Sequence, residues 1–152
     1  MRKFVECLFD IVLRGFFVDT GSPHAVLPVH WLNAGRTRLG DVKVQELGQV
    51  MRYDRMFGTE GANINFITRD SANRVWVRTY ERGVEAETLA CGTGSVASAL
   101  CASRIWSLPS PITIIAHSGK KLRVRFAGVP EEARDVVLSG PAEATFAGEF
   151  IV

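Results

Sequence analysis

The sequence predicts an α+β domain in which a curved, mostly antiparallel β-sheet, or half-barrel, wraps around one buried central helix. One helical stretch, residues 96–103, is small and uncharged throughout, whereas a surface helix would show a polar stripe. About seven or eight short β-rich segments, separated by glycine and proline, lie around it in the sequence. Because only this helix is wholly apolar, a sheet curved around it is the natural way to bury it.

The individual elements follow from local pattern in chain order. Residues 14–19 favour a strand that runs into a turn at 20–24, where glycine and proline interrupt the chain. Asp41 is a candidate cap for a helix over about 42–53, which is apolar on one face. After a loop at 81–90, the central helix is expected over about 91–106. The remaining strand predictions are 63–68, 74–80, 112–116, 121–126, 135–139 and 142–150.

Length and composition limit the possible classes. A chain of 152 residues is about one domain, and it can bury roughly two-thirds of its unfolded surface. The net charge is +2 with scattered basic residues, so we expect no nucleic-acid partner. No stretch approaches the roughly 18 apolar residues of a membrane span, and no signal peptide is expected. The three cysteines are sparse and lack metal-site spacing, which favours the cytoplasm and no metal.

The run Glu-Thr-Leu-Ala-Cys-Gly-Thr-Gly-Ser at residues 87–95 is the strongest chemical signal. It places Cys91 where a buried helix begins, facing unpaired backbone N–H groups and the positive end of the helix dipole. Both favour the thiolate, so the pattern predicts a lowered pKa and a usable base near neutral pH. Two glycines in a first helical turn are unfavourable, which favours a binding role for this turn. The alternative is that Cys91 is a structural cysteine after a packing turn. Cys101, ten residues later, is expected to be a core residue.

Five motifs occur in an order and spacing that resemble the C-terminal half of the diaminopimelate epimerases. The resemblance covers about residues 14 to 150. The motifs are DTGSPHAV at 19–26, GANINF at 61–66, RTYERG at 78–83, ETLACGTG at 87–94 and SGPA at 139–142. Residues 14–152 are therefore expected to form one domain of this family, while residues 1–13 stay unassigned.

The resemblance implies a fold of two similar β-rich half-barrels, each around a central helix, with the substrate between them. Each half offers one cysteine; one removes the α-proton and the other delivers a proton to the opposite face. The implied activity is isomerisation of an amino acid in lysine and peptidoglycan-precursor synthesis, without pyridoxal phosphate or a metal. Cys7 lacks the glycine turn of the first-half cysteine, so it is not expected to be the second base.

The resemblance also implies roles for individual residues. Cys91 is the catalytic base or acid, and the substrate-binding residues are Asn63, Glu81, Arg82, Gly92 and Thr93. Two further candidates lie near the site: His24, and Ser22, which replaces an asparagine of many members and reaches less far.

From the residues alone, each has a structural alternative. Glu81 and Arg82 could form a surface ion pair at a strand end, and Asn63 could be a turn residue. Thr93 could be a helix cap, and His24 a structural histidine.

The sequence leaves more than one function open. An epimerase needs a second half, which a homodimer or a separate N-terminal-half partner would supply. The alternative is a catalytically silent binding or structural module derived from the same family. A third hypothesis is a cysteine hydrolase in which Cys91 attacks and His24 or His117 is the base.

Overall fold

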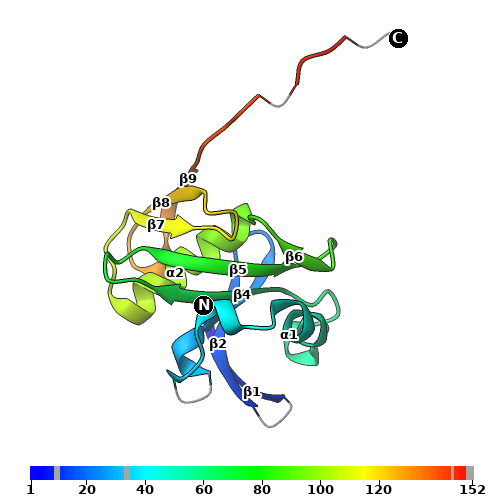
Figure 1. Cartoon of the computed structure of the whole chain (residues 1–152). Coiled ribbons are helices and arrows are strands. Elements are labelled where there is room, and N and C mark those ends of the chain that lie inside the picture. The colour runs from blue at the N-terminus through cyan, green and yellow to red at the C-terminus, as the bar shows by residue number, and fades with distance from the viewer. Residues whose placement is uncertain (9–10, 33–34, 145, 150–152) are drawn as a thin grey trace.

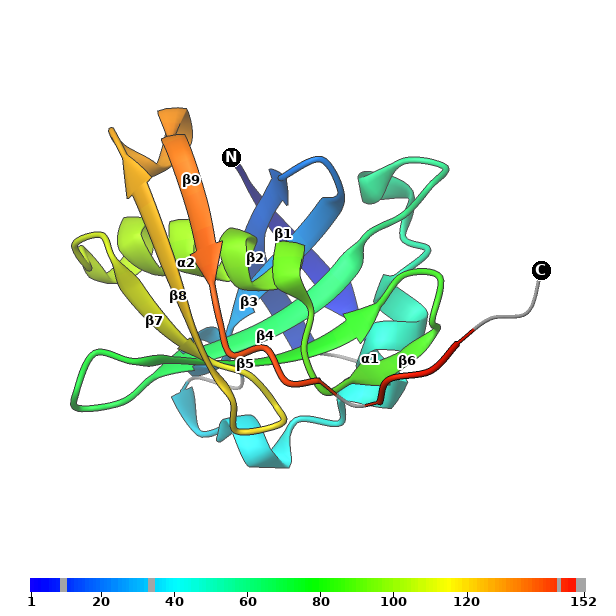
Figure 2. The ribbon, with the colours of Figure 1, turned by 90° about the horizontal axis from the view of Figure 1, so that it is seen from above.

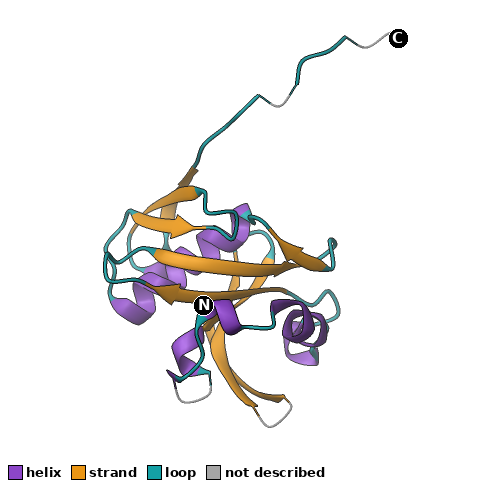
Figure 3. Ribbon diagram, viewed as in Figure 1, coloured by secondary structure: helices purple, strands orange, loops and turns teal. Residues whose placement is uncertain are grey.

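The computed structural model describes residues 1–8, 11–32, 35–144 and 146–149, without the side chains of residues 6–8, 11 and 12. In this part, nine strands form one sheet beside two α-helices (Figure 1 and Figure 3). The strands are β1 (Arg2–Leu8), β2 (Ile11–Asp19), β3 (Pro23–Pro28), β4 (Asn63–Arg69), β5 (Val75–Glu81), β6 (Ala86–Thr88), β7 (Ile112–Ile115), β8 (Lys121–Ala127) and β9 (Arg134–Ser139). The helices are α1 (Val44–Met51) and α2 (Gly92–Trp106), and 3₁₀ turns lie at Val29–Trp31, Leu39–Asp41, Arg55–Phe57 and Pro130–Glu132.

The sheet is mixed, with the order β1-β2-β3-β4-β5-β7-β8-β9, and β6 pairs with β5 beside this path. Two described strand pairs are parallel, β3 with β4 and β5 with β7, and the others are antiparallel. Parallel neighbours need a long crossover connection. Here α1 lies in the first crossover and α2 in the second. The structure therefore confirms the α+β class.

Helix α2 lies at the centre of the domain and contacts β2, β3, β4, β5, β7, β8 and β9. Figure 2 shows it between β7–β9 on one side and β2–β4 on the other. Residues 97–102 are all buried, as their small uncharged composition predicted. They form one hydrophobic cluster with the strands, whereas the chain around α1 contributes a second cluster with β3, β4 and β5.

Several elements differ from the predictions. β3 begins inside the predicted turn at 20–24, and β6 lies in the predicted loop at 81–90. β1, in the unassigned N-terminal segment, pairs with β2, which begins at Ile11. Asp41 closes a 3₁₀ turn and does not cap α1, which begins at Val44 with Lys43 at its N-cap. β3 pairs with β4 far along the chain, which a local pattern does not show, whereas β6 is a short strand that pairs with β5 directly before it.

The strand predicted at 142–150 is wrong for the residues that the structure describes there, 142–144 and 146–149. They have no strand partner, and Phe146 is 86% exposed. Residues 145 and 150 lie outside the described part. The alternating pattern of this segment is compatible with a strand, but a strand forms only where another strand can pair with it. Figure 1 shows the segment leaving the domain after β9.

Candidate functional site

Cys91 occupies the N-cap of α2 with an extended backbone, at φ −124° and ψ 119°. Its sulfur accepts a hydrogen bond from the backbone N–H of Gly94 at 3.4 Å and lies 3.6 Å from the Thr93 hydroxyl. The cysteine is only 7% exposed, whereas Gly92 and Thr93 are exposed. The sulfur therefore sits just below the surface, at the positive end of the helix dipole.

The pKa of Cys91 corrects one prediction. Burial raises this pKa above its ordinary value, and hydrogen bonds from the Thr93 side chain and the Gly94 amide only partly offset the effect. The nearby negative charge of Glu81 raises it further. The expected lowering fails because removing a thiolate from water costs more than the helix N-terminus returns. At neutral pH Cys91 is therefore a thiol.

Gly94 is required by a close approach between α2 and β4. A Cβ atom at this position would lie 2.5 Å from Oδ1 of Asn65 and 3.1 Å from the Cys91 sulfur. At Gly92 the nearest atom to such a Cβ is a methyl group of Leu138, at 3.3 Å. Only the second of the two glycines is thus explained by packing. At the exposed Gly92, only the end of the Leu138 side chain would contact an added Cβ atom.

Asn63, the first residue of β4, connects three segments. Its Nδ2 donates to the Pro23 carbonyl at 2.9 Å and to the Ser22 hydroxyl at 3.1 Å, while its Oδ1 accepts from the backbone N–H of Arg82 at 2.8 Å. The side chain is buried, and both amide protons bind protein acceptors. Asn63 therefore fixes the positions of Ser22 and Arg82, and one Oδ1 lone pair is left for a ligand.

Glu81 and Arg82 are half-buried at the end of β5. Within the part described, they do not form an ion pair with each other. Glu81 accepts a hydrogen bond from the Thr88 hydroxyl at 2.9 Å, and its charge acts on Cys91. Arg82 is 3.5 Å from the carboxylate of Glu60, which is 83% exposed. Such a long, solvent-exposed contact is weak, so the guanidinium can turn to a bound anion.

His24 is fully buried at the start of β3. Its Nδ1 lies 3.1 Å from Nδ2 of Asn65, and its Nε2 has no hydrogen-bond partner among the described residues. Burial lowers the pKa of His24 to about 4; the charge of Asp19 opposes this shift and that of Arg82 adds to it. The imidazole is therefore neutral at physiological pH.

The other predicted residues lie apart from this group. His117 is 3.4 Å from Glu87, whose carboxylate also accepts two hydrogen bonds from Arg78. Cys101 is fully buried, and burial raises its pKa far above the ordinary value, so it is a core residue as predicted. Cys7 lies in β1, and its side chain is outside the described part.

Two buried polar residues beside His24, Asn65 and Thr79, were not among the predicted site residues. Asn65 contacts His24, and the Thr79 hydroxyl donates to Asn65. The signal was present in the motif Asn-Ile-Asn, because residues two apart in a strand point to the same face. Asn63 and Asn65 both donate to backbone carbonyls of β3, those of Pro23 and Ala25.

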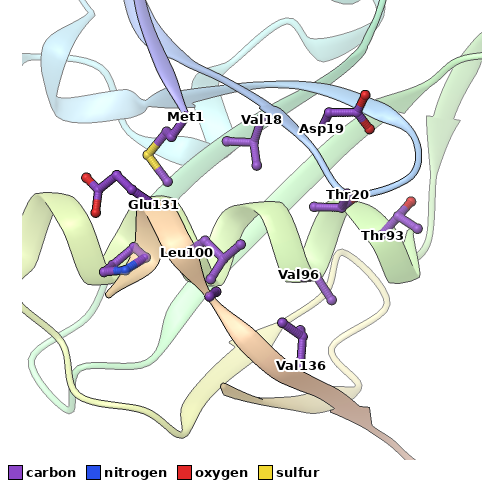
Figure 4. A pocket seen from close by; sticks show the side chains of 11 residues that line it. Met1, Val18, Asp19, Thr20, Thr93, Val96, Leu100, Glu131 and Val136 are labelled. Carbon is purple, nitrogen blue, oxygen red and sulfur yellow. The ribbon is translucent and has the colours of Figure 1, made fainter. Parts of the chain in front are cut away.

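A groove of about 450 Å³ opens along α2 beside the site. Figure 4 shows Thr93, Val96 and Leu100 along the helix, with Val18, Asp19 and Thr20 on the β2–β3 side. Thr93 therefore borders both Cys91 and open space.

In the described ranges, we find no cluster of three or more His, Cys, Asp or Glu side chains that could hold a metal ion. None of the described helices is long and apolar enough to cross a membrane.

Comparison with known proteins identifies relatives over most of the chain. The sequence model of a family described as "Diaminopimelate epimerase" matches residues 16–128. The diaminopimelate epimerase of Chlamydia trachomatis serovar D is 39% identical over 140 residues, which are 92% of this chain and 47% of that protein. The enzyme of Aquifex aeolicus is 38% identical over 136 residues, 88% of this chain and 45% of that protein.

The chain thus spans about half the length of the curated relatives it matches. Among solved structures, a phenazine biosynthesis protein of the PhzF family from Enterococcus faecalis matches with a TM-score of 0.49 and 17% identity. That match covers 73% of this chain and 37% of the other.

Proposed function

The chain belongs to the diaminopimelate epimerase family, and we propose that it forms one half-site of an amino-acid epimerase that transfers an α-proton through Cys91 without a cofactor. The observation that carries this proposal is the placement of Cys91 at the start of buried α2, with the exposed Gly92 and Thr93 beside it and Glu81 close enough to act on its charge. The sheet around α2 would be the half-barrel of the family.

The proposed chemistry starts from a protonated Cys91. A neutral thiol is suited to deliver a proton to the α-carbon. To act as a base, the sulfur needs a cation nearby, because positive charge stabilises the thiolate. The substrate's own α-ammonium group, held by Glu81, would supply that charge on binding.

Removal of an α-proton places negative charge on the α-carbon and the adjoining carboxylate. Fixed donors that face this charge lower the barrier without reorganising. In the proposed site these donors are the backbone amides at the start of α2, at Gly92 and Thr93, together with the Arg82 guanidinium. A helix N-terminus favours anions, and Arg offers a fork of donors that matches a carboxylate. Asn63 would hold Arg82 in place through its backbone.

Inversion requires a second acid–base group on the opposite face of the α-carbon. We propose that a second copy of this chain or an N-terminal-half partner supplies it. Three consecutive apolar residues of β9, the strand at one edge of the sheet, remain exposed and support such an association, because an edge strand can pair with another chain. They are Val136, Val137 and Leu138. By analogy with its relatives, the protein would act in the cytoplasm on a diamino acid of lysine synthesis.

A catalytically silent binding module is the second candidate, and the raised pKa of Cys91 is the observation that favours it. A cysteine hydrolase has less support. Neither His24 nor His117 makes a hydrogen bond to Cys91 among the described contacts, and the pKa of His24 is too low for a general base at neutral pH.

Proton exchange tests the proposal directly. The protein is incubated with LL- or meso-diaminopimelate in deuterated water, and loss of the α-proton signal is followed by NMR. We expect exchange that disappears in Cys91→Ala and persists in Cys101→Ala, a matched change in the core of the same helix. Exchange with inversion indicates a complete site, and exchange without inversion indicates a half-site with one base. A folded protein without exchange favours the silent module.

A further inference from the structure

Three buried polar side chains lie side by side on neighbouring strands behind the site. His24 is on β3, Asn65 on β4 and Thr79 on β5, and none is more than 3% exposed. Buried polar groups are costly unless they are hydrogen-bonded. The Thr79 hydroxyl lies 2.9 Å from Oδ1 of Asn65, and Nδ2 of Asn65 lies 3.1 Å from Nδ1 of His24. One nitrogen of the group, Nε2 of His24, has no described partner.

The backbone fixes which way the Asn65 amide points. Nδ2 lies 3.0 Å from the carbonyl oxygen of Ala25 and 3.4 Å from that of Asn63. A carbonyl can only accept, so the side-chain nitrogen must face these two atoms. The Asn65 oxygen therefore faces Thr79, which donates to it. This orientation holds whatever the protonation of His24.

The same orientation decides where His24 carries its proton. Nδ2 of Asn65 is a donor only, so Nδ1 of His24 must accept. A neutral imidazole that accepts at Nδ1 has its proton on Nε2. If the ring were doubly protonated, the N–H at Nδ1 of His24 would face the N–H of Asn65, with the two nitrogens 3.1 Å apart. Asp19 on β2 and Arg82 after β5 are the charged groups that act on the ring with opposite sign, and burial keeps it neutral.

We propose that Asn65 is a positioning residue that holds His24 as a neutral imidazole protonated on Nε2, so that His24 gives a hydrogen bond to the bound substrate and does not take a proton from it. The proposal rests on the proposed function for the identity of the acceptor. Nε2 is a buried donor without a described partner, and a buried donor of this kind is normally satisfied by protein, ordered water or a ligand. Asn65 also touches the start of α2, where its Oδ1 excludes a side chain at residue 94.

The tautomer can be read directly from the whole, unmodified protein. Long-range ¹H–¹⁵N correlation spectra of ¹⁵N-labelled protein distinguish a protonated ring nitrogen from an unprotonated one. The variants His30→Gln and His117→Gln, both at the surface, assign two of the three histidines and leave His24. We expect the proton on Nε2, with no titration down to about pH 5, given a pKa of about 4. A proton on Nδ1, or titration at the ordinary pKa of 6.5, overturns the proposal.

A variant tests whether Asn65 is the cause. In Asn65→Asp the amide donor becomes a carboxylate, which only accepts, so we expect the proton to move to Nδ1 and the pKa of His24 to rise. Thr79→Val is the matched control; it leaves the Nδ2 side unchanged, and we expect the tautomer to stay. Should Asn65→Asp fail to fold, Asn65→Ala replaces it, with an expected mixture of both tautomers. If the His24 tautomer is unchanged in the variant of residue 65, or if it switches in Thr79→Val, the proposed role of Asn65 is wrong.

Activity separates this inference from the proposed function. If the protein exchanges α-protons, Asn65→Asp should lower the exchange rate about tenfold, the effect of losing one hydrogen bond worth about 1.4 kcal/mol. It should also shift the pH profile of exchange while KM changes little. If the wild type shows no exchange, the proposed function fails, but the tautomer measurement still stands or falls by itself.

Discussion

The two glycines at the start of α2 allow a paired test of how the site is packed. In Gly94→Ala the new Cβ lies 2.5 Å from Oδ1 of Asn65, a buried atom that Thr79 holds by a hydrogen bond. Overpacking of this kind costs about 1–3 kcal/mol, and displacing Asn65 removes a hydrogen bond worth about 0.5–1.5 kcal/mol. Alanine regains about 1 kcal/mol of helix propensity. We therefore expect Gly94→Ala to be less stable by about 0.5–3.5 kcal/mol.

Gly92→Ala is the control for the same chemical change two residues earlier. Its Cβ would lie 3.3 Å from the end of the Leu138 side chain, which is 40% exposed and can move. We expect stability to stay the same or rise by up to about 1 kcal/mol.

Urea and thermal unfolding measure the difference, and about 2–4 °C in Tm corresponds to 1 kcal/mol in a domain of this size. Equal stability of the two variants would show that α2 and β4 are not packed as the structure has them.

Three further predictions concern charge and hydrogen bonding. Because burial raises the pKa of Cys91 above the ordinary value of 9.0, iodoacetamide should modify it with a midpoint above pH 9. A midpoint near neutrality, measured by mass spectrometry, would contradict this. Asn63→Ala removes the acceptor of the Arg82 amide and should destabilise the fold by about 1–3 kcal/mol while raising KM for proton exchange; an unchanged KM would argue that Asn63 does not position the site. Arg78→Ala breaks a well-shielded ion pair with Glu87 and should lower the free energy of unfolding by about 2–3 kcal/mol, whereas Arg74→Ala breaks a more exposed pair with Asp70 and should lower it by less than about 1 kcal/mol. Similar urea midpoints for the two variants would refute this distinction.

Composition predicted the centre of the fold better than its edges. The run at 96–103 predicts a buried helix because its side chains are uncharged and mostly small, and residues 97–102 are indeed all buried. The start of β3 at Pro23 was missed because glycine and proline mark this segment as a turn, whereas the strand also pairs with β4 far along the chain. β6 was missed because it is only three residues long and forms a short hairpin with β5. The segment 142–150 shows the reverse error, since its pattern suits a strand but the described part has none beside it.

The same limit applies to the candidate site. The position of Cys91 at the start of α2 could be predicted, because Gly-Thr-Gly before an apolar helix is a local pattern. Its pKa could not, because burial by the surrounding sheet outweighs the helix terminus. Nor could the sequence show that Glu81 and Arg82 bind different partners. Thr88 on β6 donates to the Glu81 carboxylate, and Asn63 on β4 accepts from the Arg82 backbone N–H.

The states of Cys91 and His24 together say what a working site would need. Burial leaves the first as a thiol and the second as a neutral imidazole, so neither carries charge before a ligand binds. Glu81 opposes a thiolate, and Arg82 opposes an imidazolium. On the proposed function, a zwitterionic substrate would reverse both effects at once, since its ammonium would neutralise Glu81 and its carboxylate would neutralise Arg82. Substrate binding would therefore lower the pKa of Cys91, and the pH dependence of exchange should differ between the free and the substrate-saturated protein.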